Sequence, residues 1–185
     1  RSRTKTVYFV YSGEVMLYNL TKHGNRKVIF ILGKGQLLNQ SIVSKKPNAL
    51  FCEAVCPVKV IEIAEEQFLQ LMEQSHALTR AVLREYERNL WRMGHQLKNT
   101  TGNMQMERKI ATKLWKLGRD FGVDTEDGVM IDIDLTITLM ADLVGAPREN
   151  VSRACKVLTD RGLIRYGNKR FILTDSDGLA EFYKM

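Results

Sequence analysis

The stretch Thr136–Arg170, TITLMADLVGAPRENVSRACKVLTDRGLIRYGNKR, carries the strongest structural signal in the sequence. Thr136 is a good N-cap for a helix over residues 137–144. Gly145 follows, and a glycine tolerates the positive φ that a tight turn between helices needs. A second helix is expected over about 147–160, because proline is accepted in the first turn of a helix. The sequence therefore predicts two short helices joined at a glycine corner.

The spacing of small and apolar residues around this corner matches the helix-turn-helix pattern. Counted from Ile137, the small residue Ala141 is fifth and Gly145 is ninth, so the helices can approach closely and the chain can turn. The angle between the helices is filled by apolar residues at the fourth, eighth, fifteenth and eighteenth positions, namely Met140, Val144, Val151 and Ala154. The second helix of this motif enters the major groove of DNA, so the pattern favours a DNA-binding domain.

Polar side chains near the start of the second helix are the candidates for reading bases. They share one face of that helix: Arg148, Glu149, Ser152 and Arg153. Arginine can bind guanine with two hydrogen bonds, and glutamate can accept one from cytosine. The alternative for this face is a solvated surface with an ion pair between Glu149 and Arg153, four residues apart.

A hairpin is expected after the second helix. Gly162 ends the helix, 163–166 form a strand, Gly167 and Asn168 make a two-residue turn, and 169–173 return. Phosphate contacts, which position a protein without reading sequence, are predicted for Thr138, Lys156, Lys169 and Arg170. For the last two, charges that keep an edge hairpin soluble are the alternative.

The charge distribution supports DNA binding only locally. The 185 residues carry a formal charge of +7, but residues 101–185 are neutral overall. Within 143–173, Lys and Arg clearly outnumber Asp and Glu. This local basic cluster, rather than the bulk charge, points to nucleic acid.

The first 64 residues alternate between strand-like segments and turns. Strands are predicted at 6–11, 14–18, 27–32, 49–55 and 58–63. This spacing is typical of an antiparallel, jelly-roll-like β-roll. An open edge at residue 6 would be a liability, so further strands are expected before it. A helix is predicted over 65–74.

A long helix with a heptad seam is predicted from His76 onward. The seam residues alternate at spacings of three and four: Leu83, Tyr86, Leu90, Met93, Leu97, Thr100 and Met104. Such a seam favours a parallel dimer, and the alternative is a long amphipathic helix packed on its own domain. Gly94 and Gly102 weaken the helix, and residues 99–103 are expected to form a hinge.

The expected fold class is α+β, in three parts. Residues 1–75 form an effector-sensing β-roll, 76–104 the dimerisation helix and hinge, and 105–185 a winged helix-turn-helix. Within the last part the sequence predicts a helix over 106–121, a polar loop over 122–128 and a strand over 129–134.

In this order of parts and in its motif, the sequence resembles the cyclic AMP receptor protein / fumarate–nitrate reduction regulator (CRP/FNR) family. The resemblance implies a homodimer that regulates transcription at a palindromic operator in double-stranded DNA and contacts RNA polymerase. It assigns base reading to Arg148, Glu149 and Arg153, and Ser152 matches the variant with Ser before the second Arg. Pro147 stands where the family often has Ser, so a hydroxyl is absent there.

The sensor half departs from the pattern of the members that bind cyclic AMP. Those members have Gly-Glu in the phosphate cassette and an Arg before small residues, whereas this sequence has Gly35-Gln36 and Pro47-Asn48-Ala49. Without that Arg and Glu, the cyclic phosphate and the ribose lose their charged partners. We therefore expect another effector, a small molecule or a redox signal, whose binding residues the sequence does not define.

No cofactor or metal motif is evident in the sequence. His23 lies in an expected turn and His76 and His95 lie along the long helix, so each is interpreted as a surface or packing residue rather than a haem ligand. Cys52 and Cys56 are expected to pack. An iron–sulfur cluster with ligands upstream of Arg1 stays an open alternative. An enzyme of the cupin type would need a His and carboxylate cluster on the roll, so no enzyme is expected. A ligand-binding module whose winged helix contacts proteins is the remaining alternative.

Two further features bear on location. The sequence lacks an apolar run of the roughly 20 residues that span a bilayer, so no membrane association is expected. Its three cysteines form no dense framework, which is typical of a reducing compartment. The sequence therefore favours a cytoplasmic protein.

Overall fold

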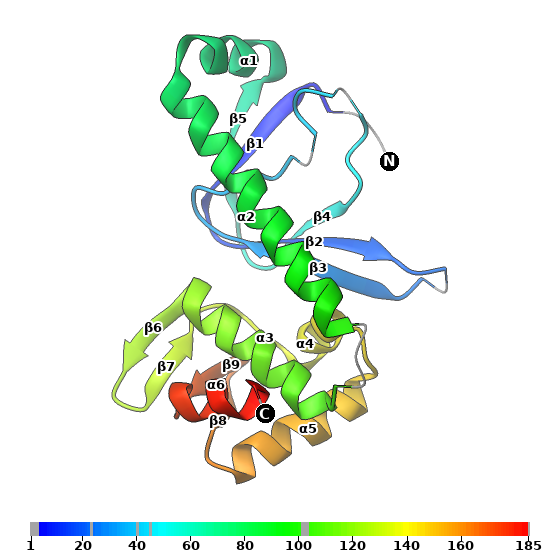
Figure 1. Cartoon of the computed structure of the whole chain (residues 1–185), viewed down its shortest axis with the longest axis vertical. Helices are drawn as coiled ribbons and strands as arrows, with labels where there is room; N and C mark the ends of the chain where they lie inside the picture. The colour runs from blue at the N-terminus through cyan, green and yellow to red at the C-terminus, as the bar shows by residue number, and fades with distance from the viewer. Residues whose placement is uncertain (1–3, 23, 40, 45, 101–103, 185) are drawn as a thin grey trace. The chain divides into compact units, whose positions relative to one another are not determined.

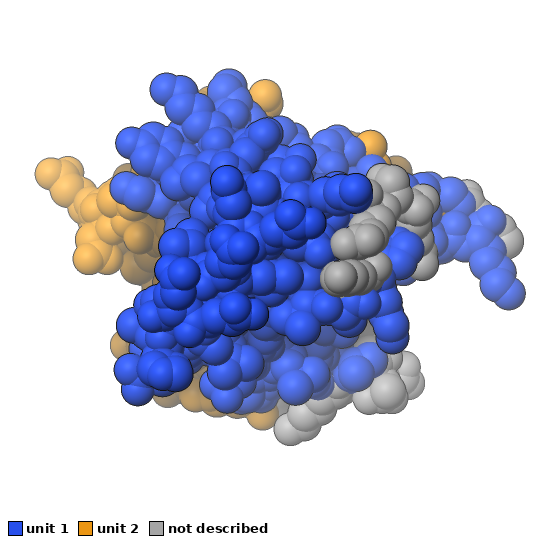
Figure 2. All heavy atoms as spheres, turned by 90° about the horizontal axis from the view of Figure 1, so that it is seen from above, with its two compact units in different colours: residues 1–24, 28–98 blue, residues 25–27, 99–185 orange. Residues whose placement is uncertain are grey.

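A computed structural model describes residues 4–22, 24–39, 41–44, 46–100 and 104–184. The chain forms two compact units (Figure 2). Residues 1–24 and 28–98 make unit 1, and residues 25–27 and 99–185 make unit 2.

Unit 1 contains two small antiparallel sheets followed by two helices (Figure 1). Its strands are β1 (Thr6–Ser12), β2 (Val15–Leu20), β3 (Arg26–Leu32), β4 (Phe51–Ala54) and β5 (Lys59–Ala64), and its helices are α1 (Glu65–Gln74) and α2 (His76–Thr100). One sheet pairs β1 with β5, and the other has the order β3-β2-β4. The predicted antiparallel β-roll is confirmed, with strand ends within about two residues of expectation.

Two apolar clusters hold the β-roll together. In one, Leu17, Phe30 and Leu32 pack between β2 and β3. In the other, Val7 of β1 packs with Phe68 of α1 and Val82 of α2, among other buried residues. Because α1 and α2 each place an apolar side chain in this second cluster, the first half of α2 is fixed to the roll by burial of apolar surface.

On a neighbouring face of α2, several side chains of the predicted seam are exposed to solvent. Leu83, Leu90 and Leu97, spaced seven residues apart, are 55%, 70% and 64% exposed, and we call these three residues the leucine seam. Met93 is exposed beside them. The single chain covers none of these four described side chains well.

The remaining residues of the predicted seam behave differently. Tyr86 packs against the roll cluster, and its hydroxyl donates to the Asn39 carbonyl (3.5 Å). Met104 lies beyond the end of α2 and is half-buried. The Thr100 side chain and residues 101–103 of the predicted hinge lie outside the described part of the structure.

Unit 2 combines four helices with a four-stranded antiparallel sheet (Figure 1). Its elements are α3 (Met106–Phe121), β6 (Gly122–Thr125), β7 (Gly128–Ile131), α4 (Ile137–Val144), α5 (Arg148–Asp160), β8 (Ile164–Gly167), β9 (Arg170–Leu173) and α6 (Ser176–Lys184). The sheet order is β6-β7-β9-β8. Its core includes the fully buried residues Ile110, Leu114, Leu158, Phe171 and Leu179.

Two sequence predictions in unit 2 need correction, and one helix was missed. The loop predicted over 122–128 is wrong, because β6 pairs with β7 from Gly122↔Ile131 to Thr125↔Gly128. The hairpin turn lies one residue later than predicted, at Asn168 and Lys169, which both have positive φ (50° and 60°). Helix α6 was not predicted.

Within the described ranges of the chain, no helix is both long enough and apolar enough to cross a membrane.

Candidate nucleic-acid interface

The corner between α4 and α5 has the geometry that the sequence predicts. Thr136 caps α4, its hydroxyl accepting from the Leu139 N–H (3.0 Å). Gly145 ends α4 in the left-handed conformation (φ 72°, ψ 49°), and its N–H donates to the Ala141 carbonyl (2.7 Å). The Ala146 N–H donates to the same carbonyl (3.2 Å). This hydrogen-bonded glycine corner confirms the helix-turn-helix.

Helix α5 begins one residue later than predicted, at Arg148, with Pro147 in the N-cap position. The Pro147 side chain makes no capping hydrogen bond, but its carbonyl accepts from the Asn150 and Val151 N–H groups (3.1 and 3.2 Å). The apolar face of α5 is buried, and its members are Val151, Ala154, Cys155 and Leu158. Burial of this face turns the opposite face of α5 to solvent.

The four residues predicted to read bases all lie on that outward face of α5. We call them the recognition patch, and each is exposed: Arg148, Glu149, Ser152 and Arg153. The Arg153 guanidinium donates to Asn150 Oδ1 (2.5 Å), three residues earlier. This contact holds Arg153 along the first turns of the helix, beside the other members of the patch.

The predicted phosphate contacts divide into two groups. Thr138 on α4, Lys156 on α5 and Lys169 in the β8–β9 turn are exposed and bring hydroxyl or ammonium groups to the surface of unit 2. Arg170 is different, because it forms ion pairs with Asp132 and Asp134. Its charge is already compensated, which favours a structural role that ties β9 to the segment before α4.

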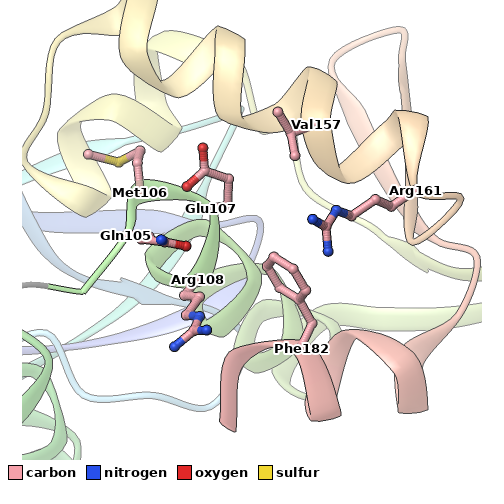
Figure 3. Close-up of a pocket in the computed structure, with 7 residues that line it drawn as sticks. All are labelled: Gln105, Met106, Glu107, Arg108, Val157, Arg161 and Phe182. Carbon is pink, nitrogen blue, oxygen red and sulfur yellow. The ribbon is translucent and has the colours of Figure 1, made fainter. Parts of the chain in front are cut away.

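A hollow of about 490 Å³ opens beside the recognition helix (Figure 3). Val157 of α5 and Arg161, the C-cap residue of that helix, line it at four and eight residues beyond Arg153. Phe182 of α6 lies opposite, with the Arg161 guanidinium 5.0 Å from its ring centre. The start of α3 completes the wall with Gln105, Met106, Glu107 and Arg108. Sequence reasoning missed this hollow because it depends on α6; Leu179 and Phe182, three residues apart, were the available signal.

In the β-roll, the side chain of Gln36, which the family resemblance aligns with the phosphate cassette, already makes two hydrogen bonds. Gln36 Oε1 accepts from the Gly33 N–H (2.8 Å), and Gln36 Nε2 donates to Glu85 Oε1 of α2 (3.3 Å). Glu85 also forms an ion pair with Arg88. A neutral amide thus links the cassette turn to α2 in place of a free carboxylate.

The three cysteines, all among the described residues, form no disulfide bond. The prediction that Cys52 and Cys56 pack in the protein interior is wrong for Cys52, which is exposed on β4. Cys56 is partly buried, and its thiol donates a hydrogen bond to the Glu14 carboxylate (2.9 Å). Burial in α5 raises the pKa of the Cys155 thiol to about 11. Across the described residues, no group of three or more His, Cys, Asp or Glu side chains is placed to hold a metal ion.

Comparison with known proteins agrees with both halves of the structure. A cyclic nucleotide-binding domain model matches residues 2–75, and a Crp-like helix-turn-helix domain model matches residues 108–182. The CRP-like cAMP-activated global transcriptional regulator of Mycobacterium tuberculosis is 25% identical over 175 residues, covering 94% of this chain and 78% of that protein.

Other relatives are similar at the same level. The global nitrogen regulator of a Nostoc species is 25% identical over 167 residues, covering 89% of this chain and 74% of that protein. The solved structure of FixK2 from Bradyrhizobium japonicum superposes with a TM-score of 0.82 at 20% identity, over 97% of this chain and 88% of that chain. Both relatives in sequence are named as global regulators, and the Mycobacterium tuberculosis protein is named as a transcriptional regulator.

The second helix of a helix-turn-helix enters the major groove of DNA. With the two matching domain models and the named relatives, this motif identifies the chain as a DNA-binding transcription regulator. The chain belongs to the CRP/FNR family of such regulators, as its two matching domain models and its relatives show.

The raised pKa of Cys155 makes the free energy of unfolding of the protein depend on pH. Below the pKa of about 9 of an unfolded cysteine, both states hold the neutral thiol. Between pH 9 and 11 the unfolded chain loses this proton more readily than the folded chain, so stability falls as pH rises. The stability advantage of the wild type over Cys155→Ala should therefore be constant from pH 7 to 8.5 and shrink by about 2 kcal/mol by pH 11. Urea unfolding of both proteins at each pH measures this difference, and a constant advantage would contradict it.

Proposed function

We propose that the protein is a homodimeric, sequence-specific transcription regulator whose β-roll senses an effector other than cyclic AMP. The recognition patch is the observation that carries this proposal. Its four polar side chains are exposed together on the outward face of α5, next to a glycine corner of helix-turn-helix geometry. In this proposal Arg148, Glu149, Ser152 and Arg153 read base edges in the major groove.

The phosphate contacts surround this patch. Thr138, Lys156 and Lys169 are exposed and bind the DNA backbone, which sets the register of α5 in the groove. Arg170 contributes only if a phosphate replaces Asp132 and Asp134, so we assign it the smallest share.

The leucine seam supports the dimer. Three leucines repeat every seven residues along α2, each more than half exposed in the single chain. A partner helix would remove this apolar surface from water. A parallel pair of α2 helices gives the regulator a two-fold axis, so its operator would be palindromic, with half-sites about 34 Å apart.

In this proposed dimer, each part of the chain has its own role. Residues 1–75 sense the effector, 76–104 form the dimerisation helix and hinge, and 105–185 bind DNA. RNA polymerase is the partner through which such a regulator would act. Three cysteines without a dense disulfide framework support a location in the reducing cytoplasm.

The engaged Gln36 side chain supports an effector other than cyclic AMP. Its amide already bonds Gly33 and Glu85, and Pro47 supplies no guanidinium for a phosphate. A cyclic phosphate bound there would lose its hydration, and no charged side chain would offset that free-energy cost.

Arg153→Ala tests base reading. Operator sequences are first selected from a random duplex pool, and affinity is then measured by fluorescence anisotropy at several salt concentrations. The variant should lose about 1–3 kcal/mol per half-site on the selected operator and lose discrimination at one base pair of each half-site. Arg80→Ala, which changes an exposed arginine on α2, is the control. An equal loss on operator and random DNA would count against base reading by Arg153.

Leu90→Glu tests the dimer. A buried, unpaired carboxylate in the middle of the leucine seam should convert the protein to a monomer at micromolar concentration, as seen by sedimentation equilibrium. Ala81→Glu, which adds the same charge to an exposed position of the same helix, should leave the dimer intact. If both variants remain dimeric, the seam is not the interface.

Isothermal titration calorimetry with cyclic AMP tests the effector assignment. We expect a dissociation constant weaker than about 100 µM, because the charged partners of the cyclic phosphate are absent. Tighter binding would show that this roll holds the nucleotide in another way.

A further inference from the structure

Asn150 lies at the edge of the recognition patch, in the first turn of α5. It is the third residue of this helix and is half-buried, between the exposed patch and the buried apolar face. Asparagine stabilises a helix less than alanine does, because its side chain competes for backbone hydrogen bonds. The stability of α5 therefore gives no reason for an asparagine at this position.

Pro147 removes the usual partner of a side chain at the third position of a helix. In a capping box, a Glu or Gln at this position reaches back and accepts a hydrogen bond from the N–H of the N-cap residue. Pro147 occupies the N-cap position of α5 and, as a proline, has no N–H group. The Asn150 side chain instead bonds forward along the helix, where its Oδ1 atom accepts from the Arg153 guanidinium (2.5 Å).

This contact selects one of two positions for the Arg153 guanidinium. A side chain on a helix can bond those three or four residues earlier, and for Arg153 these are Asn150 and Glu149. Asn150 lies about 60° round the helix on one flank of Arg153, and Glu149 lies about 40° round it on the other. The guanidinium lies on the Asn150 side, and the two described residues Glu149 and Arg153 form no ion pair with each other.

Base reading needs Glu149 and Arg153 to act separately. An arginine donates to guanine and a glutamate accepts from cytosine, so an ion pair between the two would occupy both groups before DNA binds. The neutral amide oxygen of Asn150 holds the guanidinium without occupying the carboxylate. A side chain that is already held in one position also loses less conformational entropy on binding.

We propose that Asn150 is a positioning residue of the recognition patch, which holds Arg153 apart from Glu149 so that each side chain reads its own base pair. This inference rests on the base reading proposed above and adds a residue to it. Asn150 acts through Arg153 and needs no contact with a base. Without the Asn150 amide, Arg153 turns toward Glu149, and each side chain is partly occupied by the other.

Asn150→Ala tests this role on the operator selected for the wild type. Affinity measured by fluorescence anisotropy should fall about threefold per half-site, or about tenfold for a dimer on two half-sites. Affinity for random duplex DNA should change less than about twofold, because the phosphate contacts are kept. Urea unfolding should show no loss of stability, since alanine is the better helix former.

Thr159→Ala is the matched control at the other end of α5. It removes an exposed side chain whose hydroxyl bonds the Cys155 carbonyl of the same helix. Because Thr159 lies outside the recognition patch, operator affinity should change less than about twofold.

The pattern of base preference separates positioning from direct contact. Arg153→Ala and Glu149→Ala should each relax the preference at one base pair of the half-site, and Asn150→Ala should relax both. When Arg153 is already alanine, Asn150→Ala should weaken operator binding less than about twofold, because no guanidinium is left to position. A loss there as large as in the wild type would show that Asn150 contacts DNA itself and that the positioning role is wrong.

These measurements separate the inference from the proposed function. If Arg153→Ala relaxes one base pair while Asn150→Ala binds as the wild type does, base reading stands and the positioning role is wrong. If the wild type selects no sequence from the pool, or if Arg153→Ala weakens binding to operator and random DNA alike, base reading by Arg153 and its positioning by Asn150 are both wrong.

Discussion

The recognition patch depends on one constraint, which is the close packing of α5 on α4 across Gly145. The left-handed conformation there (φ 72°) lets the Ala141 carbonyl accept two N–H groups, and an L side chain would be strained in it. This turn positions α5 so that Val151, Ala154 and Leu158 on one of its faces are buried. Because a helix with one buried face must expose the other, the outward direction of the patch follows from burial of its apolar residues.

Much of this could be predicted from the sequence, because the information is local. Thr136 caps its own helix, Gly145 sets its own dihedral angles, and the apolar period fixes which side of α5 is buried. The elements that could not be predicted depend on distant partners. β6 is a four-residue strand that is exposed along its length and has one apolar side chain, Val123, so only its pairing with β7 makes it a strand. α6 is a nine-residue helix containing Gly178, held by burial of Leu179 and contact of Tyr183 with Trp115.

The same distinction separates the candidate site residues. Exposure of Arg148 and Arg153 follows from the helical period, so the sequence predicts it. The ion pairs of Arg170 with Asp132 and Asp134 join residues more than 35 positions apart, and no local pattern indicates them. The hairpin turn was misplaced by one residue for a related reason. Burial of both Phe171 and Leu173 in the core sets the strand register, and a two-residue turn must then fall at Asn168 and Lys169.

Helix α2 connects the β-roll to the proposed dimer interface, because one of its faces packs on the roll and another carries the leucine seam. One face shares the core cluster of the roll through Val82 and the polar link of Glu85 with Gln36, so the roll cannot rearrange there without moving the helix. The next face carries the leucine seam, whose exposed apolar surface has a free-energy cost in the single chain. A rotation of α2 that improves one set of contacts must change the other, since both belong to one rigid element. In the proposed dimer, an effector that binds the roll with different affinities in two helix orientations would therefore shift the population between them.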